Sequence, residues 1–415
     1  MIKDSDSLLD GFERSSLDWA QEGESYYSYL NRTGREAFCR IRRILDAWFL
    51  DYPINARHEL RSRFVSEDNS THSGAFFELY IHALFIAQDF VIEVHPSVKD
   101  TDKSPDFLIV NAQGQRAIVE CKVIDPDECG GKSDRRLDFL ANKLARVHSP
   151  DFFLWVDIIS EGESTPSAKT IAEKAAYFLD SLCWDDVIKY NSNSFQDFPA
   201  IDIVDGRWTF RCIALPKKRD ARGKENVRTL GHLGKIEAVN VPSRENLVKA
   251  ITRKAARYGK LDVPYLIAVN RVSPLADEED IGLAMFGNIG VSFNTITGTT
   301  NEFREPNGFW IGPKGPKNRR VSGILEVQQL LPHTIAKVTP RLWHNPWALK
   351  PYPQDCYSAP QRIPCMKEGK MLTIPGRRAC NILGVKHNLL EEPGQQDDGT
   401  EGLWSNQKFT DLIVE

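Results

Sequence analysis

The sequence lacks any apolar run long enough to cross a membrane. A membrane helix needs roughly 18 to 20 consecutive apolar residues, and no stretch of this 415-residue chain reaches that length. The start, MIKDSDSLLDGFERSS, also lacks the basic-then-apolar pattern of an export signal. We therefore expect no membrane partner and a cytoplasmic location.

Cysteine is sparse and shows no metal-binding pattern. The eight cysteines are scattered along the chain and form no C-x-x-C pair. Buried thiols are the default interpretation of such a distribution. The alternative is a zinc site made of Cys356, Cys365, Cys380 and His387, although these spacings match no known zinc finger.

Nucleotide-binding loops are absent as well. The chain contains neither a G-x-x-x-x-G-K-[ST] loop nor a G-x-G-x-x-G loop. These loops hold the phosphates of ATP and of dinucleotides. The sequence therefore excludes ATP-driven translocation as an activity of this chain.

Composition and length are those of a folded, soluble protein. Hydrophobic residues make up 41% and charged residues 27% of the chain, close to ordinary globular values. This balance excludes global disorder. The length suits two or three domains with a full hydrophobic core.

Positive charge is concentrated in one segment. The chain as a whole has 53 Lys plus Arg against 57 Asp plus Glu, a net charge of −4, which argues against a protein that coats nucleic acid non-specifically. Residues 207–260, however, hold 15 basic and 4 acidic residues, a local balance of +11 that leaves −15 for the rest. This segment predicts contact with a polyanion.

Hydrophobic periodicity predicts alternating helices and short strands. Apolar residues at helical spacing indicate helices over 35–52, 73–88, 133–148, 167–182 and 243–259. Runs rich in β-branched residues indicate strands over 91–98, 106–110, 116–124, 152–159, 208–215 and 263–270. Such alternation predicts an α/β fold with a mixed central sheet flanked by helices.

Three regions are expected along the chain. Residues 1–70 form a helical N-terminal region, and residues 71–275 form the α/β domain. Helical periodicity fades after about residue 275, where the last 140 residues hold 12 of the 23 prolines. We expect 276–415 to be a loop-rich, partly β C-terminal extension.

The most informative stretch is SPDFLIVNAQGQRAIVECKV, residues 104–123. Two strands flank the polar turn NAQGQ, and Asp106 and Glu120 each lie seven residues from its midpoint. In a symmetric antiparallel hairpin such residues are opposite each other on one face, roughly 5 Å apart at Cβ. The hairpin therefore brings two carboxylates together.

Two carboxylates this close require a cation. Like charges repel and raise a carboxyl pKa, and Mg²⁺ accepts one or two carboxylates while leaving positions for water and phosphate oxygens. Lys122 follows Glu120 by two residues and so lies on the same strand face. A carboxylate pair with a lysine suits metal-assisted phosphodiester hydrolysis.

These residues resemble a known motif. Pro105-Asp106, a spacer of thirteen residues and Glu120-Cys121-Lys122 resemble the PD-(D/E)xK motif of the restriction endonuclease-like nuclease superfamily. That superfamily has a further acidic residue on the helix before its first core strand, a place that Glu78 matches. The order helix, three strands, helix, strand between 73 and 159 also resembles its αβββαβ core, and the likeness covers about a fifth of the chain.

The resemblance implies a role for each matching residue. Asp106 and Glu120 would bind Mg²⁺, with Mn²⁺ as a substitute, and the carbonyl of Cys121 would be a further ligand. Lys122 would assist the attacking water, and Glu78 would complete or orient the metal shell. The implied activity is a metal-dependent endonuclease cutting DNA, in restriction or in defence against foreign DNA, and a homodimer is compatible with it.

A basic helix is the second candidate for function. Within 243–260, Lys249, Arg253 and Arg257 form a ridge at i, i+4 spacing that suits phosphate contacts. Lys254 lies on the opposite, apolar side of the same helix, where it must reach solvent or meet a buried anion. The basic stretches at 216–224 and 312–320 are expected on loops.

Simpler interpretations remain open for these residues. E-x-K on a strand is often a solvated charge stripe, and Glu78 could pair with His82 on an exposed helix face. We expect His95 to be structural, and Trp343 and Trp347 to be core residues rather than base-stacking ones. The rival functions are a catalytically silent nucleic-acid-binding or scaffold protein and an RNA-directed nuclease.

Overall fold

The computed structural model describes residues 7–21, 23–99, 101–124, 135–189, 197–219, 221–223, 229–234, 244–272, 278–293, 299–365, 370–387 and 389. The chain divides into two compact units. The large unit takes Met1–Asp18, Ser25–Gly130 and Val241–Glu392, and the inserted unit is built around Gly131–Asn240. The inserted unit thus interrupts the sequence of the large one.

The large unit is organised around one mixed sheet of eight strands. The strands run in the order β1-β2-β3-β8-β13-β14-β15-β16. Parallel pairing joins β3 to β8, β8 to β13 and β14 to β15, and the other neighbours are antiparallel. The strands are β1 Val91–Val94, β2 Phe107–Val110, β3 Arg116–Ile124, β8 Tyr265–Arg271, β13 Gly323–Gln328, β14 Arg341–His344, β15 Gln361–Cys365 and β16 Lys370–Ile374.

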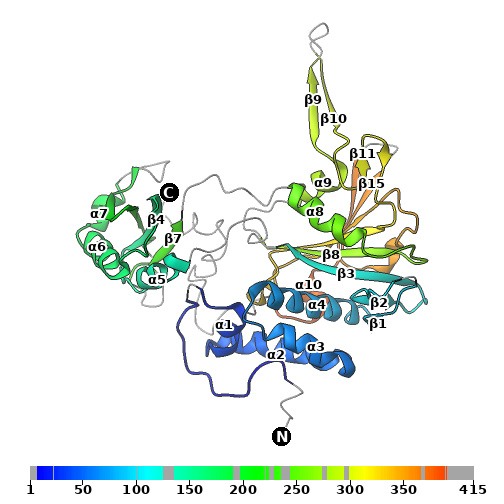
Figure 1. Cartoon of the computed structure of the whole chain (residues 1–415), viewed down its shortest axis with the longest axis horizontal. Helices are drawn as coiled ribbons and strands as arrows, with labels where there is room; N and C mark the ends of the chain where they lie inside the picture. The colour runs from blue at the N-terminus through cyan, green and yellow to red at the C-terminus, as the bar shows by residue number, and fades with distance from the viewer. Residues whose placement is uncertain are drawn as a thin grey trace. The chain divides into compact units, whose positions relative to one another are not determined.

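Helices cover both faces of this sheet. In Figure 1, α4 lies against one face of β3 and β8, and α8 lies against the other. The helices α1, α2 and α3 pack on α4 in turn. The helices of this unit are α1 Tyr26–Arg32, α2 Glu36–Asp51, α3 Ile54–Phe64, α4 Asn69–Ile86, α8 Arg244–Ala255, α9 Glu278–Phe286 and α10 Ala379–Leu383.

The helix α4 is buried on all sides, and its sequence explains why. The run from Ala75 to Phe85 is almost wholly apolar, so no face of the helix favours solvent. The predicted face of Phe77, Ile81, Leu84 and Phe85 is buried. The helix begins earlier than expected, because the carboxylate of Asp68 caps it by accepting from Thr71 N at 2.8 Å.

Alternation along the strands decides which side chains meet which helix. Ile118 and Ile267 belong to the core under α8, whereas Val119 and Ala268 belong to the core under α4. Successive residues of a strand point to opposite faces. Glu120 therefore faces α8, and Cys121 faces α4.

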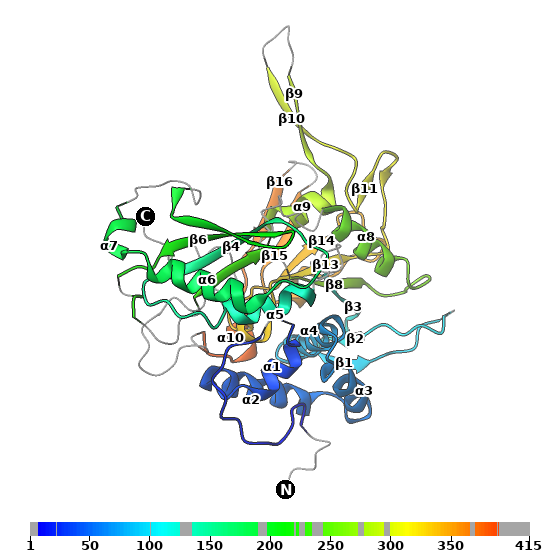
Figure 2. The ribbon, with the colours of Figure 1, turned by 60° about the vertical axis from the view of Figure 1, so that its left-hand side comes forward.

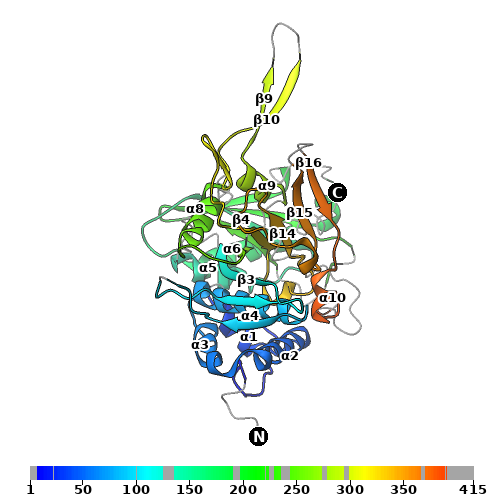
Figure 3. The same cartoon turned by 90° about the vertical axis from the view of Figure 1, so that its right-hand side faces the viewer.

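Two hairpins of the large unit lie outside its central sheet. The hairpin of β9 (Ile289–Phe293) and β10 (Thr300–Arg304) projects from the sheet in every view, as Figure 3 shows most clearly. A second short hairpin joins β11 (Ile311–Gly312) to β12 (Gly315–Pro316). None of the described helices has the length and apolar character needed to cross a membrane.

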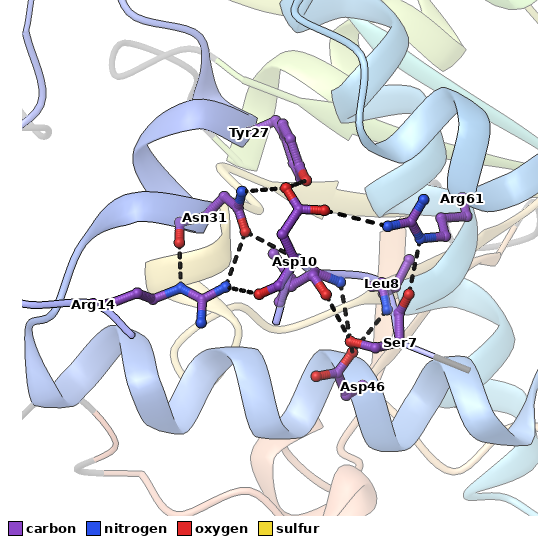
Figure 4. Close-up of polar contacts among 9 residues, drawn as sticks. Ser7, Leu8, Asp10, Arg14, Tyr27, Asn31, Asp46 and Arg61 are labelled. Atoms are coloured by element: carbon purple, nitrogen blue, oxygen red, sulfur yellow. Dashed lines mark hydrogen bonds and ion pairs between the residues drawn. The ribbon is translucent and has the colours of Figure 1, made fainter. Parts of the chain in front are cut away.

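The segment 7–14 before α1, which we call the N-terminal strap, holds the first helices together through polar contacts (Figure 4). The carboxylate of Asp10 accepts from Tyr27 on α1 at 3.1 Å and from Asn31 at 2.8 Å. It also lies 3.5 Å from the guanidinium of Arg61 on α3. This strap therefore fixes α3, the helix that carries Glu59 and Arg63, against α1.

The inserted unit has its own sheet and its own core. Its four strands run in the order β5-β6-β4-β7, and α5 and α6 pack together against them (Figure 2). The elements are α5 Arg135–Leu144, β4 Phe152–Ser160, α6 Ala168–Asp180, α7 Trp184–Val187, β5 Ala200–Asp205, β6 Trp208–Pro216 and β7 Leu230–Gly234.

The structure corrects the expected order of the core. The helix predicted over 133–148 and the strand over 152–159 do form, as α5 and β4, but they belong to the inserted unit. The helix and strand that continue the large sheet after β3 are α8 and β8. Periodicity identifies single elements, but it contains no information on which elements pair across an insertion.

The expected boundaries differ from the observed units in two further ways. The region 71–275 contains parts of both units, and helices of 1–70 share a core with α4. The region 276–415 is more than an extension, because four of its strands, β13 to β16, complete the central sheet. Pro364 within β15 pairs with Met371 of the edge strand β16, so proline did not prevent sheet formation there.

Candidate functional site

Asp106 and Glu120 meet where the β2–β3 hairpin opens. Glu120 lies in the middle of β3, and Asp106 directly precedes β2. The register ends with Phe107 opposite Val119, which places Asp106 across from Glu120. Since their neighbours Leu108 and Ile118 share the core under α8, both carboxylates belong to that face of the sheet.

Residues of α8 and the turn after it surround Glu120. Its side chain is fully buried, and its Oε1 lies 2.6 Å from Lys254 Nζ and 2.9 Å from Arg257 Nη1. The hydroxyl of Tyr258 donates to Oε2. Burial and the nearby Glu120 raise the pKa of Tyr258, which keeps this hydroxyl protonated as a donor. Two cations and a hydroxyl thus compensate one buried carboxylate.

Asp106 is compensated far less. Its Oδ2 accepts one hydrogen bond, from Cys121 N at 2.6 Å, and no cation of the described chain contacts its carboxylate. Burial, together with the charges of Glu120 and Glu78, raises the pKa of Asp106 to about 7. A carboxyl group in this position gains from any additional cation.

The backbone of Cys121 points toward Asp106. In a strand the N–H and C=O of one residue face the same neighbour, and the N–H of Cys121 donates to Asp106. The carbonyl of Cys121 therefore also faces this side, beyond the last β2 residue paired with β3. Burial raises the pKa of the Cys121 thiol, so a neutral thiol on the α4 face is a poor metal ligand and the carbonyl is the better one.

Glu78 lies on the α4 side of the same region. It is buried and receives a hydrogen bond of 2.6 Å from the hydroxyl of Tyr52 and an ion pair of 2.8 Å from Arg63. The expected partner His82 is not among these contacts. The ligand atoms of Glu78, Glu59 and His95 lie within 4.8 Å of one another, and Arg63 also pairs with Glu59 at 2.5 Å.

Lys122 lies on the same face as Glu120. It is half-buried in β3, two residues after Glu120 and opposite Val269 of β8. The period of the strand directs both side chains to the α8 face. The structure thus gathers Asp106, Glu120 and Lys122 on one face, while Glu78 approaches from the other.

The predicted basic ridge is divided in the structure. Lys249 and Arg253 are exposed. Arg257, which was expected beside them, instead reaches Glu120, and Lys254 meets the same carboxylate. The anion expected opposite Lys254 is therefore a residue of this chain.

The basic segment 207–260 is also divided between the two units. Several of its cations in the inserted unit have acidic partners: Arg207 pairs with Glu163, Arg211 with Asp202 and Arg222 with Asp151. Lys217 is fully buried and donates to Ser149 O. The cations of this segment are therefore shared between two units, and several of those described in the inserted unit are already compensated.

Some site residues gave little signal in the sequence. Tyr258 follows α8 by three residues, and its hydroxyl meets the same carboxylate of Glu120 as Lys254 does. Tyr52, directly after α2, and Arg63 on α3 precede the motif, and their spacing to Glu78 follows no rule. Cys356, Cys365, Cys380 and His387 form no metal-sized group within the described residues.

No protein-family model, curated protein or solved structure gives a significant match to this chain. The geometry of the site is therefore the only ground on which a function is proposed below.

The raised pKa of Asp106 predicts a pH-dependent stability. The folded state holds this proton up to about pH 7, whereas the unfolded chain loses it near pH 4. The free energy of unfolding therefore falls as pH rises from about 4 to about 7. Asp106→Asn removes this charge but keeps an oxygen for Cys121 N–H, so we expect the variant to be more stable than wild type at pH 8, by on the order of 2 to 4 kcal/mol.

Urea unfolding at pH 4 and pH 8 measures this difference. The gain should disappear at pH 4, where Asp106 of the wild type is protonated. A variant that is equally stable or less stable than wild type at pH 8 would contradict the prediction. Asp102→Asn, on the exposed loop nearby, serves as the control.

The contacts of Glu78 predict a second stability effect. Arg63→Met leaves Glu78, which is 3% exposed, without its cation, and we expect a loss of about 3 kcal/mol. Tyr52→Phe should cost about 1 to 3 kcal/mol, because it removes one buried hydrogen bond. Chemical denaturation of Arg63→Met, Glu78→Gln and the double variant gives the coupling energy. The double variant should recover much of the loss, and strict additivity would refute the pairing.

Proposed function

We propose that this chain is a metal-dependent nuclease that hydrolyses phosphodiester bonds in DNA. The observation that carries the proposal is the convergence of Asp106 and Glu120 on one sheet face, with Lys122 two residues along the same strand. This is a minimal set of groups for metal-assisted hydrolysis, because it supplies ligands for a cation and an ammonium group beside it.

The order of elements supports the likeness to the restriction endonuclease-like core. Helix α4, the strands β1, β2 and β3, and then α8 and β8 follow one another in the large unit once the inserted unit is set aside. The parallel pairing of β3 with β8 keeps the motif strand in the centre of the sheet. The large unit thus has a helix, three strands, a helix and a strand in the order that the motif implies. The second helix and the fourth strand are α8 and β8, not the segments 133–148 and 152–159 that were expected.

The residues present fit a hard divalent cation such as Mg²⁺, or Mn²⁺ in its place. Asp106 and Glu120 offer carboxylate oxygens, and Cys121 offers a carbonyl oxygen on the same side. Hard divalent cations prefer such oxygen donors. Asp106 also lacks a cationic partner among the described residues, which leaves its charge for the ion. When bound, the ion would polarise the scissile phosphate and acidify a water.

The surrounding residues prepare the site for a phosphate. Lys254 and Arg257 hold Glu120 in place and supply positive charge beside its Oε1. Lys122, on the same face, would orient the attacking water or offset charge in the transition state. Glu78, fixed by Tyr52 and Arg63, adds a third negative charge that favours cation binding at Asp106.

The cellular role proposed here is restriction or defence against foreign DNA in the cytoplasm, and a homodimer would allow both strands to be cut. A catalytically silent nucleic-acid-binding or scaffold protein is the rival interpretation. An RNA-directed nuclease is the third. The three differ in the substrate cleaved and in whether any cleavage occurs.

The nuclease proposal predicts loss of activity on removal of Lys122. With Mg²⁺ and supercoiled plasmid, single-stranded DNA or RNA as substrate, we expect DNA cleavage by the wild type and none with EDTA. Lys122→Ala should lower the rate by at least about 100-fold, and the exposed Lys103→Ala should leave it unchanged. Cleavage of RNA alone would favour the RNA-directed enzyme, and full activity of Lys122→Ala and Asp106→Asn would refute the proposed site.

The cations around Glu120 predict a change in metal affinity. Lys254→Met removes one positive charge 2.6 Å from a proposed ligand, so Mg²⁺ no longer competes with it and should bind about tenfold more tightly. Calorimetric titration with Mg²⁺ measures this affinity, and Lys249→Met on the exposed side of α8 is the matched control. Weaker Mg²⁺ binding by Lys254→Met would show that Glu120 is not a ligand.

A further inference from the structure

Exposed cations gather on two neighbouring parts of the large unit. One part is the outer side of α8 and the turn after it, and the other is the β11–β12 hairpin with the residues that follow it. We call this set the basic rim. Its members are all exposed: Lys249, Arg253, Lys260, Lys314, Lys317, Arg319 and Arg320.

The two parts of the rim are held together. Arg320 donates to the carbonyl of Tyr258 at 2.9 Å, directly after α8. Val321 and Tyr258 belong to the same buried apolar cluster. The hairpin also lies beside α8 in all three views (Figures 1 to 3). The rim is therefore one surface, although its parts are separated by more than fifty residues of sequence.

The charges of the rim have no acidic partners among the described residues. In the part of the chain that the structure describes, none of its seven cations forms an ion pair with a carboxylate. The inserted unit is different, since its exposed Lys169, Lys189, Arg207 and Arg211 each pair with an acidic residue. A chain with a net charge of −4 thus leaves one surface with uncompensated positive charge.

The rim leads directly to the candidate site. The hydroxyl of Tyr258 donates to Glu120, while its carbonyl accepts from Arg320. Arg257, between Arg253 and the site, reaches Glu120 itself. Residues four apart on a helix are separated by about 6 Å along its axis, so Lys249 and Arg253 follow one another along α8. Arg257, in the turn directly after the helix, continues these cations to Glu120.

We propose that the basic rim binds the phosphate backbone of a nucleic acid and guides it to the carboxylates at Asp106 and Glu120. The guiding role rests on the proposed nuclease function, whereas binding of the backbone by the rim does not. Uncompensated cations attract a polyanion by releasing its condensed counterions, and the affinity then falls steeply with salt. Contacts of this kind fix the position of the strand and carry no base specificity.

The test compares two variants with the same change in charge. In the rim variant, Lys249, Arg253, Lys314 and Lys317 are replaced by Gln, because these side chains make no hydrogen bond within the described structure. In the control variant, Lys169, Lys189, Arg207 and Arg211 of the inserted unit are replaced by Gln. Fluorescence anisotropy with a labelled DNA duplex, in EDTA and over a range of salt, measures binding without cleavage.

We expect at least tenfold weaker binding by the rim variant, and a slope of log affinity against log salt that is smaller by about 3. The control variant should bind like the wild type. Equal losses in both variants would show that only net charge matters and would overturn the inference, as would absence of duplex binding by the wild type. Polyglutamate that competes as well as DNA would indicate an acidic protein partner and would also overturn it.

The same experiment separates the inference from the nuclease proposal. We expect the rim variant to fold, since its replaced side chains are exposed, and circular dichroism and urea unfolding check this. Loss of binding in the rim variant of a chain that cuts no substrate would support the rim and refute the nuclease. Cleavage of DNA that is equally fast in the rim variant and the wild type at low enzyme concentration would refute the rim and leave the nuclease.

Discussion

Repulsion among buried carboxylates is the constraint on which the rest of the site depends. Burial, together with the nearby charges of Glu120 and Glu78, raises the pKa of Asp106. Each buried charge needs a partner or a proton. Lys254 and Arg257 satisfy Glu120, and Arg63 satisfies Glu78. Asp106 has one backbone hydrogen bond and no cationic partner among the described residues. An added cation is therefore most favourable beside the carboxylate of Asp106.

The partners that compensate these carboxylates come from parts of the chain that are far apart in sequence. Glu78 requires Arg63 on α3, and the N-terminal strap holds α3 through Asp10 and Arg61 (Figure 4). Glu120 requires α8, which follows the inserted unit. The inserted unit can be accommodated between β3 and α8 because it has its own sheet and core. Folding of the large unit must therefore bring together residues more than a hundred positions apart before the carboxylates are compensated, a non-local pairing that costs loop-closure entropy.

The sequence predicted the local features of the site and not its partners. Asp106 and Glu120 lie in one hairpin, so turn symmetry and strand period sufficed to place them on one face. Lys254 was recognised as a cation on an apolar helix side, and the structure shows Glu120 opposite it. Which acid it would meet depends on the pairing of β3 with β8 across an insertion of a whole unit. Hydrophobic periodicity contains no information on which strands pair. For the same reason, the helix and strand expected within 133–159 were assigned to the wrong sheet.

The energetic cost of Asp106 bears on why the residue is there. The half-buried carboxyl of Asp106, once ionised beside two others, destabilises the folded state, and asparagine would fill the same space and accept the same hydrogen bond. A purely structural hairpin gains nothing from the acid. In a site that binds a divalent ion, the same carboxylate raises the affinity for the ion. Binding of the ion then stabilises the folded state and offsets the destabilisation by the carboxylate. Stability sacrificed at one position is a common property of functional sites, and here it is localised at the end of a strand where the carbonyl of Cys121 also faces.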